Sequence, residues 1–517
     1  MQELLSPQAA VAWLRDKVTG RLRTDSRKLM PGDGFLAWPG AAHDGRSHVP
    51  GALAQGAAAC LVERDGAQQS GFQDPRVASY PGLKAASSQV AGAYYGNPSH
   101  RLRVLAVTGT NGKTSTAWWL AQALSSANLN PALPCAMIGT LGIGRPPAPG
   151  AVADADADTD HLATLASTGL TTPDPVLLQS SLMDFADAGM AACALEASSI
   201  GIDAHRLDAI RIHTAIFTNF TQDHLDYHGS MDAYWRAKTR LFEWPGLGAA
   251  VVNIDDPKGA DLLARLDSRQ LDVWTISCTA PARLRASAIR MTGAGLSFLV
   301  TEGGQRHRLA TRLIGQYNVS NLLGVIAAMR ANGVPLAHAV LACAELAPVP
   351  GRMQCVVQPA MPLLAIDYAH TPDALDQALA ALRPLAQERG GRLWCVFGCG
   401  GDRDPGKRPP MGTAARGADH VVVTSDNPRS EDPLAIIAQI MPALVGHASV
   451  LQQSDRARAI EQAVLAAASA DVVLLAGKGH EAYQEVAGQR RPFSDLAQAR
   501  AALAMRRAAQ SALGARA

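Results

Sequence analysis

The sequence predicts an α/β protein of three domains, over residues 1–101, 102–347 and 348–517. Three observations lead to this prediction. The chain has 517 residues, whereas a single domain usually holds about 100–200. Short apolar runs alternate with helical patterns after residue 101, which is typical of parallel sheets covered by helices. The proline-rich stretch "APVPGRM" interrupts this alternation and marks the start of a third domain.

The first two domains differ in their patterns. In the first, "GDGFLAWPG" and "AAACLVER" predict short strands separated by glycine turns. The second begins with "VLAVTGTNGKTSTAWWLAQAL", which has the pattern of a strand, a glycine loop and a helix. The runs "AACALEAS", "HTAIFTNF" and "AAVVNID" have the length of buried strands, and "GQYNVSNLLGVIAAMRANGV" predicts a helix that ends at a glycine. Residues 146–169 are rich in Ala, Asp and Pro; they could bind a cation, but we favour a solvated insertion loop.

The third domain contains four predicted strands, in "LLAIDYAH", "RLWCVFGCGG", "HVVVTSDNP" and "DVVLLAGKGHE". Polar loops and helical patterns follow the first three, and a glycine-rich loop follows the fourth. This is a second α/β domain. Functional residues are therefore expected at the carboxyl ends of these strands.

The composition excludes several classes of protein. With 47 basic and 45 acidic residues, the net charge is +2, so we expect no general binding to nucleic acid. The N-terminus lacks the pattern of a signal peptide, and no apolar run approaches the length of a membrane span. We therefore expect a soluble cytoplasmic protein with no membrane insertion. A monomer is also expected, although none of these patterns determines the oligomeric state.

The eight cysteines form no CxxC pair, so neither a zinc ribbon nor a thioredoxin-like site is indicated. Cys193 and Cys395 lie in apolar runs, where buried free thiols are expected. This usage indicates a reducing compartment.

The glycine loop after the first strand of the second domain is a candidate phosphate-binding site. Backbone N–H groups and a helix N-terminus bind anionic phosphate, Lys113 would reach the terminal phosphates, and the Thr114 hydroxyl would bind Mg²⁺. The usual pattern has a glycine where this chain has Val107, so the run 109–114 is a shortened version. The flanking strand and helix disfavour a chance glycine turn. A nucleotide loop alone is compatible with a switch, a kinase, a motor or a ligase.

A cluster of acids and histidines lies near this loop in the predicted sheet. Glu196 ends the strand "AACALEASS", and Asp223, His224, Asp226 and His228 follow the next strand. Magnesium takes oxygen ligands such as Glu196 and Thr114, and a histidine could complete the shell. Lys238 follows on a helix, where an isolated lysine is usually only solvated.

At this point the sequence resembles a known family, the ATP-dependent Mur ligases of peptidoglycan synthesis. The motifs that carry the resemblance occur in the family's order between residues 104 and 481. They are "TGTNGKTS", "LEASS", "TNFTQDHLDYHG", "NIDDP", "GQYNVSN", "PGRM", "DYAHTPDAL", "FGCGGDRDPGKRP", "SDNPR" and "GKGHE". "TDSRKLMPGDGF" and "TTPDP" point to the members that add the third amino acid to UDP-N-acetylmuramoyl-L-alanyl-D-glutamate.

The resemblance implies a fold for each domain: a small N-terminal α/β domain that binds the UDP group, a central P-loop ATPase-like domain and a C-terminal Rossmann-like domain. It implies that ATP and Mg²⁺ are required and that the partners are small-molecule substrates. Lys113, Glu196, His224 and Lys238 are implied as catalytic, with Lys238 carbamylated to N6-carboxylysine. The implied metal ligands are Thr114, Glu196, His224 and Lys238. The implied ATP contacts are Gly109, Thr110, Asn111, Gly112, Lys113, Thr114, Ser115, Asn318, Arg352, Asp367 and His370.

The resemblance also implies contacts to the two other substrates. Ser26, Thr171, Thr172, Ser198 and Arg206 would hold the UDP-muramoyl-dipeptide. Relatives often have His and Gln where this chain has Ile200 and Ala204, and we expect this departure to affect the grip on the dipeptide but not the reaction. The implied contacts to the incoming amino acid are Arg403, Asp426, Asn427, Pro428, Arg429, Gly477 and Glu481.

The stretch "SDNPRSEDP" indicates which amino acid enters. Members that add meso-2,6-diaminopimelate resemble Asp-Asn-Pro-Arg here, and lysine-adding members depart at the arginine. An arginine binds the second carboxylate of diaminopimelate with two charge-assisted hydrogen bonds, and lysine would leave Arg429 without its anion. Taken alone, "DNPR" is also compatible with an ordinary turn. A dinucleotide fingerprint in "FGCGGDR" would need glycine in place of Arg403, which argues against an NAD site.

The expected reaction is ATP-driven amide formation through an acyl phosphate, completed by closure of the third domain. The alternatives are a lysine-adding ligase, an enzyme like folylpolyglutamate synthase, and a non-catalytic ATP-binding protein. "DNPR", "GKGHE" and the first domain argue against the second, and the set Lys113, Glu196, His224 and Lys238 argues against the third.

Overall fold

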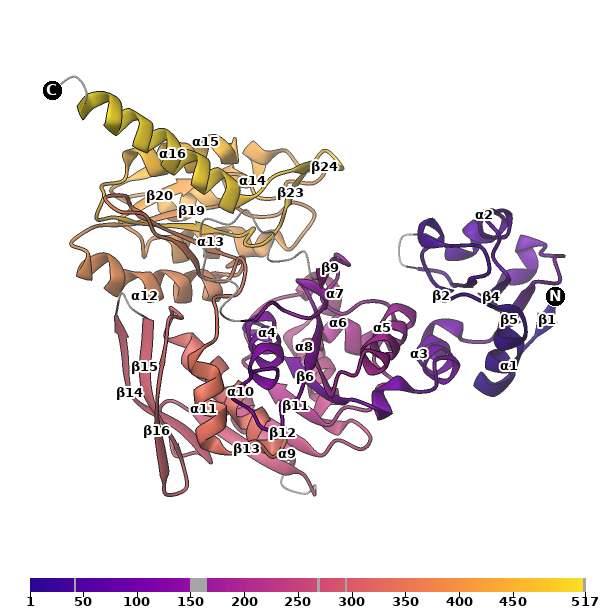
Figure 1. The fold of residues 1–517 in the computed structure, drawn as a ribbon. Helices are drawn as coiled ribbons and strands as arrows, with labels where there is room; N and C mark the ends of the chain where they lie inside the picture. The colour runs from indigo at the N-terminus through magenta and orange to yellow at the C-terminus, as the bar shows by residue number, and fades with distance from the viewer. Residues whose placement is uncertain (41–42, 149–164, 267–269, 293–294, 515–517) are drawn as a thin grey trace.

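The computed structural model describes residues 1–40, 43–148, 165–266, 270–292 and 295–514. It contains three sheet-based units that follow one another along the chain (Figure 1). Most of the predicted insertion loop at residues 146–169 lies outside the described residues. In the described part of the chain, no helix is long and apolar enough to cross a membrane.

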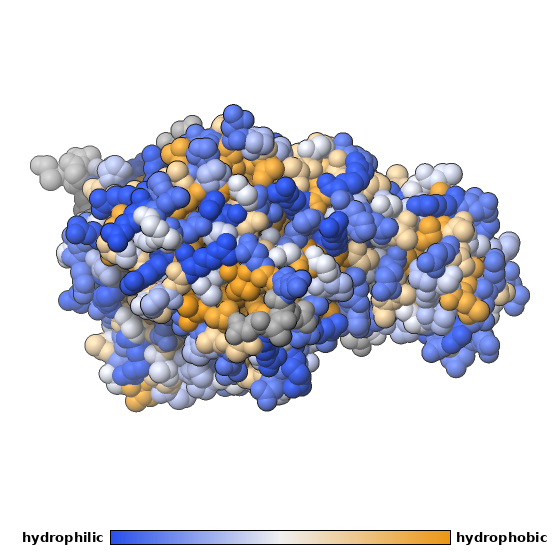
Figure 2. Space-filling view, turned by 90° about the horizontal axis from the view of Figure 1, so that it is seen from below, coloured by the Kyte–Doolittle hydropathy of each residue, from blue (hydrophilic) through white to orange (hydrophobic). Residues whose placement is uncertain are grey.

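The N-terminal unit is a small parallel sheet covered by short helices. Its strand order is β1-β5-β4-β3-β2, and every neighbouring pair is parallel. Figure 2 shows this unit as a separate lobe at the right of the molecule. The strands are β1 (Gln2–Glu3), β2 (Leu22–Arg23), β3 (Gly34–Ala37), β4 (Ala59–Glu63) and β5 (Val77–Tyr80), and the helices are α1 (Pro7–Lys17), α2 (Val49–Ala54) and α3 (Leu83–Tyr94).

The central unit is an 11-stranded sheet with a parallel core in the order β13-β12-β11-β6-β10-β7. These strands are β6 (Arg103–Thr108), β7 (Cys135–Gly139), β10 (Ala192–Glu196), β11 (Thr214–Phe217), β12 (Ala249–Asn253) and β13 (Asp272–Ser277). The helices are α4 (Lys113–Leu124), α5 (Pro175–Asp187), α6 (Ser199–Asp203), α7 (Leu225–His228), α8 (Met231–Thr239), α9 (Pro257–Leu266), α10 (Tyr317–Ala331) and α11 (Leu336–Ala344). The predicted parallel sheet is confirmed for this core.

Antiparallel pairs, which were not predicted, extend the central sheet at both edges, although β14 itself joins β13 in parallel. On one side lie β14 (Leu284–Thr292), β15 (Gly295–Glu302) and β16 (Gln305–Thr311); on the other lie β8 (Gly142–Gly144) and β9 (Leu165–Ala166). Along the first part of β14 the buried residues alternate with exposed ones, because only one face of this part of the sheet is covered. These strands were not predicted, because their apolar residues do not form the continuous runs that indicate a buried strand.

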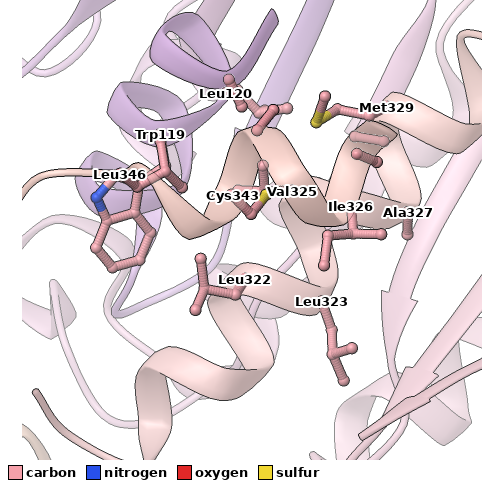
Figure 3. Packing of buried hydrophobic residues seen from close by; sticks show 14 of the residues in the cluster. Trp119, Leu120, Leu322, Leu323, Val325, Ile326, Ala327, Met329, Cys343 and Leu346 are labelled. Atoms are coloured by element: carbon pink, nitrogen blue, oxygen red, sulfur yellow. The ribbon is translucent and has the colours of Figure 1, made fainter. Parts of the chain in front are cut away.

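The hydrophobic centre of this unit lies between the sheet and three helices. Helix α10 is buried along most of its length, because the sheet packs on one side of it and α4 and α11 pack on the other. Figure 3 shows Trp119 and Leu120 of α4 facing Leu322 and Val325 of α10. This packing fixes α4, and hence the glycine loop at its N-terminus, against the sheet.

The C-terminal unit is a six-stranded sheet in the order β17-β18-β22-β19-β20-β21. All neighbours are parallel except β17 and β18. The strands are β17 (Gln354–Val356), β18 (Leu363–Asp367), β19 (Leu393–Phe397), β20 (His420–Val423), β21 (Val450–Gln452) and β22 (Val472–Ala476), and a separate hairpin is formed by β23 (Tyr483–Val486) and β24 (Gln489–Pro492). The helices are α12 (Pro372–Glu388), α13 (Arg408–Ala415), α14 (Pro433–Ile440), α15 (Arg456–Ala466) and α16 (Asp495–Gly514). All four predicted strands of this domain are confirmed.

Candidate active site

The glycine loop connects β6 to α4, as predicted. Gly109 has φ +147°, and a Cβ there would lie 1.9 Å from Thr218 Oγ1, so only glycine fits. The N–H of Thr110 donates to Asn219 O, and the N–H of Asn111 donates to Asn219 Oδ1. The loop is therefore held from the neighbouring strand end, next to the N-terminus of α4. Ser115 lies buried in the first turn of that helix.

Two lysines meet at this loop. Lys113 Nζ donates to Gly109 O at 2.9 Å and to Thr110 O at 2.8 Å. Lys238, from α8, donates to the same Gly109 O at 2.7 Å and lies 4.3 Å from the ring centroid of Tyr234. Lys238 is 1% exposed and forms no salt bridge to any described carboxylate. Burial, and the charge of Lys113 beside it, lower the pKa of Lys238 well below its usual value.

Glu196 lies at the end of β10, on the other side of the same helix N-terminus. Its Oε2 accepts from Thr114 Oγ1 at 3.0 Å and from Thr140 Oγ1 at 3.1 Å, and its Oε1 accepts from Thr140 N at 2.8 Å. The side chain is fully buried, and burial raises its pKa. A hydroxyl and a carboxylate are therefore side by side at the loop, which is the kind of oxygen donor set that suits magnesium.

The acid and histidine cluster does not converge on one point. His224 has φ +53° and lies 3.5 Å from Asp223, whereas His228 Nε2 lies 3.0 Å from Ser199 Oγ. Among the described residues, no group of three or more His, Cys, Asp or Glu side chains could hold a metal ion. A metal site here would therefore need the mixed donors that were predicted, from a hydroxyl, a carboxylate, a histidine and a modified lysine.

Asp223 instead joins two domains. Its Oδ1 accepts a short hydrogen bond from Lys407 of the C-terminal domain, and its Oδ2 lies 4.0 Å from His370 Nε2. Burial would raise the pKa of Asp223, but the charges of His370, His224 and Lys407 hold it below its usual value. A second contact between the two domains runs from Asn111 Nδ2 to Asp373 Oδ2 at 3.1 Å.

The other predicted ATP contacts lie around the linker between these domains. Arg352 donates from NH2 to Thr114 Oγ1 at 3.2 Å and lies 4.2 Å from the ring centroid of Tyr368. Asp367 accepts from Met353 N at 2.6 Å, and burial raises its pKa to about 6. Asn318 is engaged within its own helix start, because its Nδ2 donates to Ile314 O and its Oδ1 accepts from Asn321.

Four of the five residues predicted to hold the nucleotide-linked dipeptide form one network. Thr172 Oγ1 lies 2.9 Å from Ser198 Oγ and donates to Glu196 O, Arg206 donates to Thr172 O at 2.6 Å, and Thr171 Oγ1 lies 3.0 Å from Thr140 Oγ1. Ser26 begins the short helix η1 (Ser26–Lys28) in the N-terminal lobe, so a ligand shared with this network would have to reach across to that lobe (Figure 1).

The residues predicted to bind the incoming amino acid gather at the carboxyl ends of β19, β20 and β22, as expected for an open parallel sheet. Asn427 Nδ2 donates to Glu481 Oε2 at 2.8 Å, and a Cβ on Gly477 would lie 2.3 Å from Asp426 Oδ2. Arg429, which follows Pro428 at φ +53°, donates from NH1 to Gly401 O at 2.6 Å. Arg403 points to the central domain and lies 3.6 Å from Asp226.

Three residues that were not predicted complete this site: Thr140, Tyr234 and Lys407. Thr140 binds both oxygens of Glu196, and its position after the apolar run "CAMIG" was the available signal. Tyr234 packs on Lys238 and contacts Thr110 Oγ1 at 3.2 Å, and no sequence signal marked it. Lys407 lies within the quoted motif "FGCGGDRDPGKRP", but only the fold brings it to Asp223.

Comparison with known proteins gives consistent matches along the chain. Family models described as Mur ligase family, catalytic domain, Mur ligase middle domain, and Mur ligase, glutamate ligase domain match residues 20–95, 107–329 and 351–479. A UDP-N-acetylmuramoyl-L-alanyl-D-glutamate--2,6-diaminopimelate ligase from Acidovorax sp. (strain JS42) is 60% identical over 510 residues, covering 98% of this chain and 99% of that protein. The ligase of the same name from Pseudomonas aeruginosa is 44% identical and covers 97% of each chain.

Two solved structures extend this comparison. The structure of a UDP-N-acetylmuramoyl-L-alanyl-D-glutamate--2,6-diaminopimelate ligase is 34% identical, with a TM-score of 0.61 and coverage of 94% of this chain and 95% of that one. MurF ligase from Thermotoga maritima in complex with ADP is 19% identical, with a TM-score of 0.63 and coverage of 90% and 94%; at that identity it shows the fold alone.

Proposed function

The chain belongs to the Mur ligase family, and we propose that it joins meso-2,6-diaminopimelate to UDP-N-acetylmuramoyl-L-alanyl-D-glutamate at the expense of ATP. It is an ATP-dependent acid–amino-acid ligase of peptidoglycan precursor synthesis. The observation that carries this conclusion is the end-to-end match to ligases of that activity. The lysine-adding, folylpolyglutamate synthase-like and non-catalytic alternatives are not favoured.

The glycine loop and Lys113 would hold the phosphates of ATP. In the described chain, the Lys113 ammonium is satisfied only by two loop carbonyls, which a phosphate could replace. Arg352, already within hydrogen-bonding distance of Thr114, would add a second cation from the linker side. Both groups offset charge as the substrate carboxylate attacks the γ-phosphate and ADP leaves.

Thr114, Glu196 and His224, with a carbamate on Lys238, would hold Mg²⁺. Among the described residues, the hydrogen bonds that the buried carboxylate of Glu196 accepts all come from neutral groups, so a cation bound to it would offset its burial. Bound magnesium would neutralise phosphate charge. His224 is kept neutral by burial, which lowers its pKa to about 4, so its ring is available as a ligand.

The surroundings of Lys238 support its carbamylation. Lys113 and Lys238 both donate to Gly109 O, where two ammonium charges would repel each other, and burial favours the neutral amine of Lys238. A neutral amine adds to carbon dioxide, forming an N–C bond and releasing one proton. The product is an anion, which would pair with Lys113 and provide the oxygen ligand that an ammonium group cannot.

The amino acid would enter from the C-terminal domain. Its amine attacks the acyl phosphate, and the tetrahedral intermediate collapses to the amide and phosphate. Arg429 would bind the carboxylate at the far end of diaminopimelate, with Glu481 beside it for the far ammonium. The contacts of Lys407 with Asp223 and of Asn111 with Asp373 support a closed arrangement that brings this site to the phosphate loop.

We also propose that the enzyme acts in the cytoplasm, as a monomer, on small-molecule substrates alone. All eight cysteines are free thiols, which suits a reducing compartment.

The test is phosphate release by the purified protein with ATP, Mg²⁺ and UDP-N-acetylmuramoyl-L-alanyl-D-glutamate, with diaminopimelate, lysine or no amine. Release that depends on diaminopimelate is expected. The variant Arg429→Met should lose this release, whereas the control Arg490→Met, on the exposed hairpin strand β24, should keep it. Release with lysine alone would overturn the assignment of the amino acid, and no release with any amine would overturn the ligase activity.

A further inference from the structure

Lys478 is a buried cation beside the amino-acid site, and the function proposed above assigns it no role. It follows Gly477 at the carboxyl end of β22, and its side chain is 0% exposed. Its Nζ lies 2.8 Å from Glu481 Oε2 and 3.0 Å from Asn427 Oδ1. Burying an ammonium group lowers stability unless the group is paired. Since Lys478 is buried and paired beside the amino-acid site, we ask what its contacts do there.

The hydrogen bonds around Lys478 fix the orientation of Glu481. Glu481 Oε2 accepts from both Lys478 Nζ and Asn427 Nδ2, each at 2.8 Å. Within the part of the chain that the structure describes, its other oxygen, Oε1, accepts no hydrogen bond. One oxygen of the carboxylate is therefore engaged by the protein, and one is left for a ligand.

The same hydrogen bonds give Asn427 a role that differs from the direct contact to the amino acid that was predicted. Its Oδ1 accepts from Lys478 Nζ and from Glu485 N at 2.9 Å, and its Nδ2 donates to Glu481. The residue is 4% exposed. Asn427 therefore acts on the amino acid through Glu481, and Lys478 determines which way its amide points.

Lys478 also sets the charge balance of the site. Arg429 and Lys478 supply two positive charges, and the buried Asp426 and the part-buried Glu481 supply two carboxylates. The carboxylate of Asp402, near Arg429, is exposed to solvent and accepts hydrogen bonds from Ser430. The nearby cations Arg456 and Arg403 have their own partners, Asp495 and Asp226. The far end of diaminopimelate carries one carboxylate and one ammonium group, so it is neutral overall and matches this balance. The far end of lysine carries only an ammonium group.

We propose that Lys478 is a positioning and specificity-determining residue for the amino acid. It fixes Glu481 so that one oxygen meets the far ammonium group, and it keeps the site from becoming net negative, which would favour lysine. This inference rests on the proposed function. Without Lys478, one cation would face two carboxylates, and the site would suit a substrate end with a single positive charge.

The test compares Lys478→Met with the unchanged enzyme in the phosphate-release assay, with each amine. The KM for diaminopimelate should rise about tenfold or more, because a charged hydrogen-bond network is lost, and the KM for ATP should change less than about twofold. The ratio of kcat/KM for diaminopimelate to that for lysine should fall about tenfold. Combined with Glu481→Gln, Lys478→Met should add little, because both act through the same carboxylate.

A second variant covers the case in which Lys478→Met does not fold. Asn427→Asp also makes the site more negative by one charge but leaves Lys478 paired, so it should shift the selectivity toward lysine as well. As a matched control, Arg330→Met removes a largely buried cation of the central domain, which is paired with Glu302, and should leave the selectivity unchanged.

The failures of the two proposals can be told apart. If the unchanged enzyme releases no phosphate with diaminopimelate, the proposed function fails. If it does, and neither Lys478→Met nor Asn427→Asp alters the selectivity, or if the KM values of all substrates rise together, Lys478 has only a structural role and the inference fails.

Discussion

Replacing Asp367 by asparagine should stabilise the protein at alkaline pH while weakening its use of ATP. Asp367 ends β18, and its carboxylate is only 9% exposed. It accepts a hydrogen bond from Met353 N across the domain linker. Burial raises its pKa from 3.8 to about 6, although the charge of Arg352 acts in the opposite direction. The ionised form of this buried carboxylate therefore lowers the free energy of unfolding.

The size of this cost follows from the pKa difference. One pKa unit corresponds to about 1.4 kcal/mol, so a shift of roughly two units makes the ionised form cost about 3 kcal/mol in the folded state. Because the folded pKa is raised, the contribution of Asp367 to stability is fully present below about pH 4 and is lost as the pH rises through about 6. Asparagine is neutral throughout and can still accept the hydrogen bond from Met353.

Thermal unfolding of the ligand-free protein at pH 5, 6, 7 and 8 measures this effect. The Asp367→Asn variant should unfold at a higher temperature than the unchanged protein at pH 8, by a margin that shrinks toward pH 5. Asp16→Asn, at an exposed position, serves as the control and should show no such trend. The KM for ATP should rise in Asp367→Asn because Asp367 is one of the proposed contacts to ATP. A margin that stays constant or grows as the pH falls would refute the reasoning.

Three further predictions concern Gly477 in the proposed amino-acid site, Lys238 in the proposed metal site, and the contact of Lys407 that joins two domains. Gly477→Ala should raise the KM for diaminopimelate, with little change in the KM for ATP, because the new Cβ would lie 2.3 Å from Asp426 Oδ2; equal increases in both would contradict this. Lys238→Met should abolish phosphate release. When the protein is trapped under carbon dioxide, the peptide that contains Lys238 should carry the mass of one added CO₂, and a peptide without this added mass would disprove the carbamylation of Lys238. Lys407→Met should lower kcat, because it leaves the carboxylate of Asp223, which is 7% exposed, without its closest cation. Breaking a buried ion pair typically costs about 3–5 kcal/mol of stability, and this pair should lose less because the Lys407 side chain is 16% exposed. Small-angle scattering should show a more extended molecule, and an unchanged scattering profile with an unchanged kcat would argue against this closure contact.

Much of the site could be predicted from the sequence because its residues lie at the ends of apolar strands. Glu196, Asp367 and Asp426 follow runs whose length and composition predict buried strands, and parallel strands place such ends at one edge of a sheet. The glycine loop was recognisable for the same reason, since it lies between a strand and a helix. In these places the local pattern indicates the edge of the sheet at which the residue lies, whereas the roles of Asp367 and Asp426 were predicted from the resemblance to the family.

Contacts between domains could not be predicted in this way. Lys407 and Asp223 are 184 residues apart, and each is an ordinary loop residue until the C-terminal domain closes on the central one. The antiparallel strands from residue 284 to 311 escaped prediction for a different reason, because only one of their faces is covered and their apolar residues therefore do not form continuous runs.

Arg403 makes a contact between domains that its sequence motif does not predict. Its place in "GGDRDPGKR" implies a contact to the amino acid, yet its guanidinium lies 3.6 Å from Asp226 of the central domain and is 61% exposed. One guanidinium cannot fully pair with Asp226 and with a substrate carboxylate in different directions. If Arg403 binds the amino acid as proposed, that binding would therefore compete with its contact to Asp226. The pair is exposed, and an exposed ion pair is worth about 1 kcal/mol or less, so a carboxylate bound with two hydrogen bonds can displace it. Lys407 is more buried and is bound to Asp223, so we expect it to hold the two domains together if Arg403 changes partner.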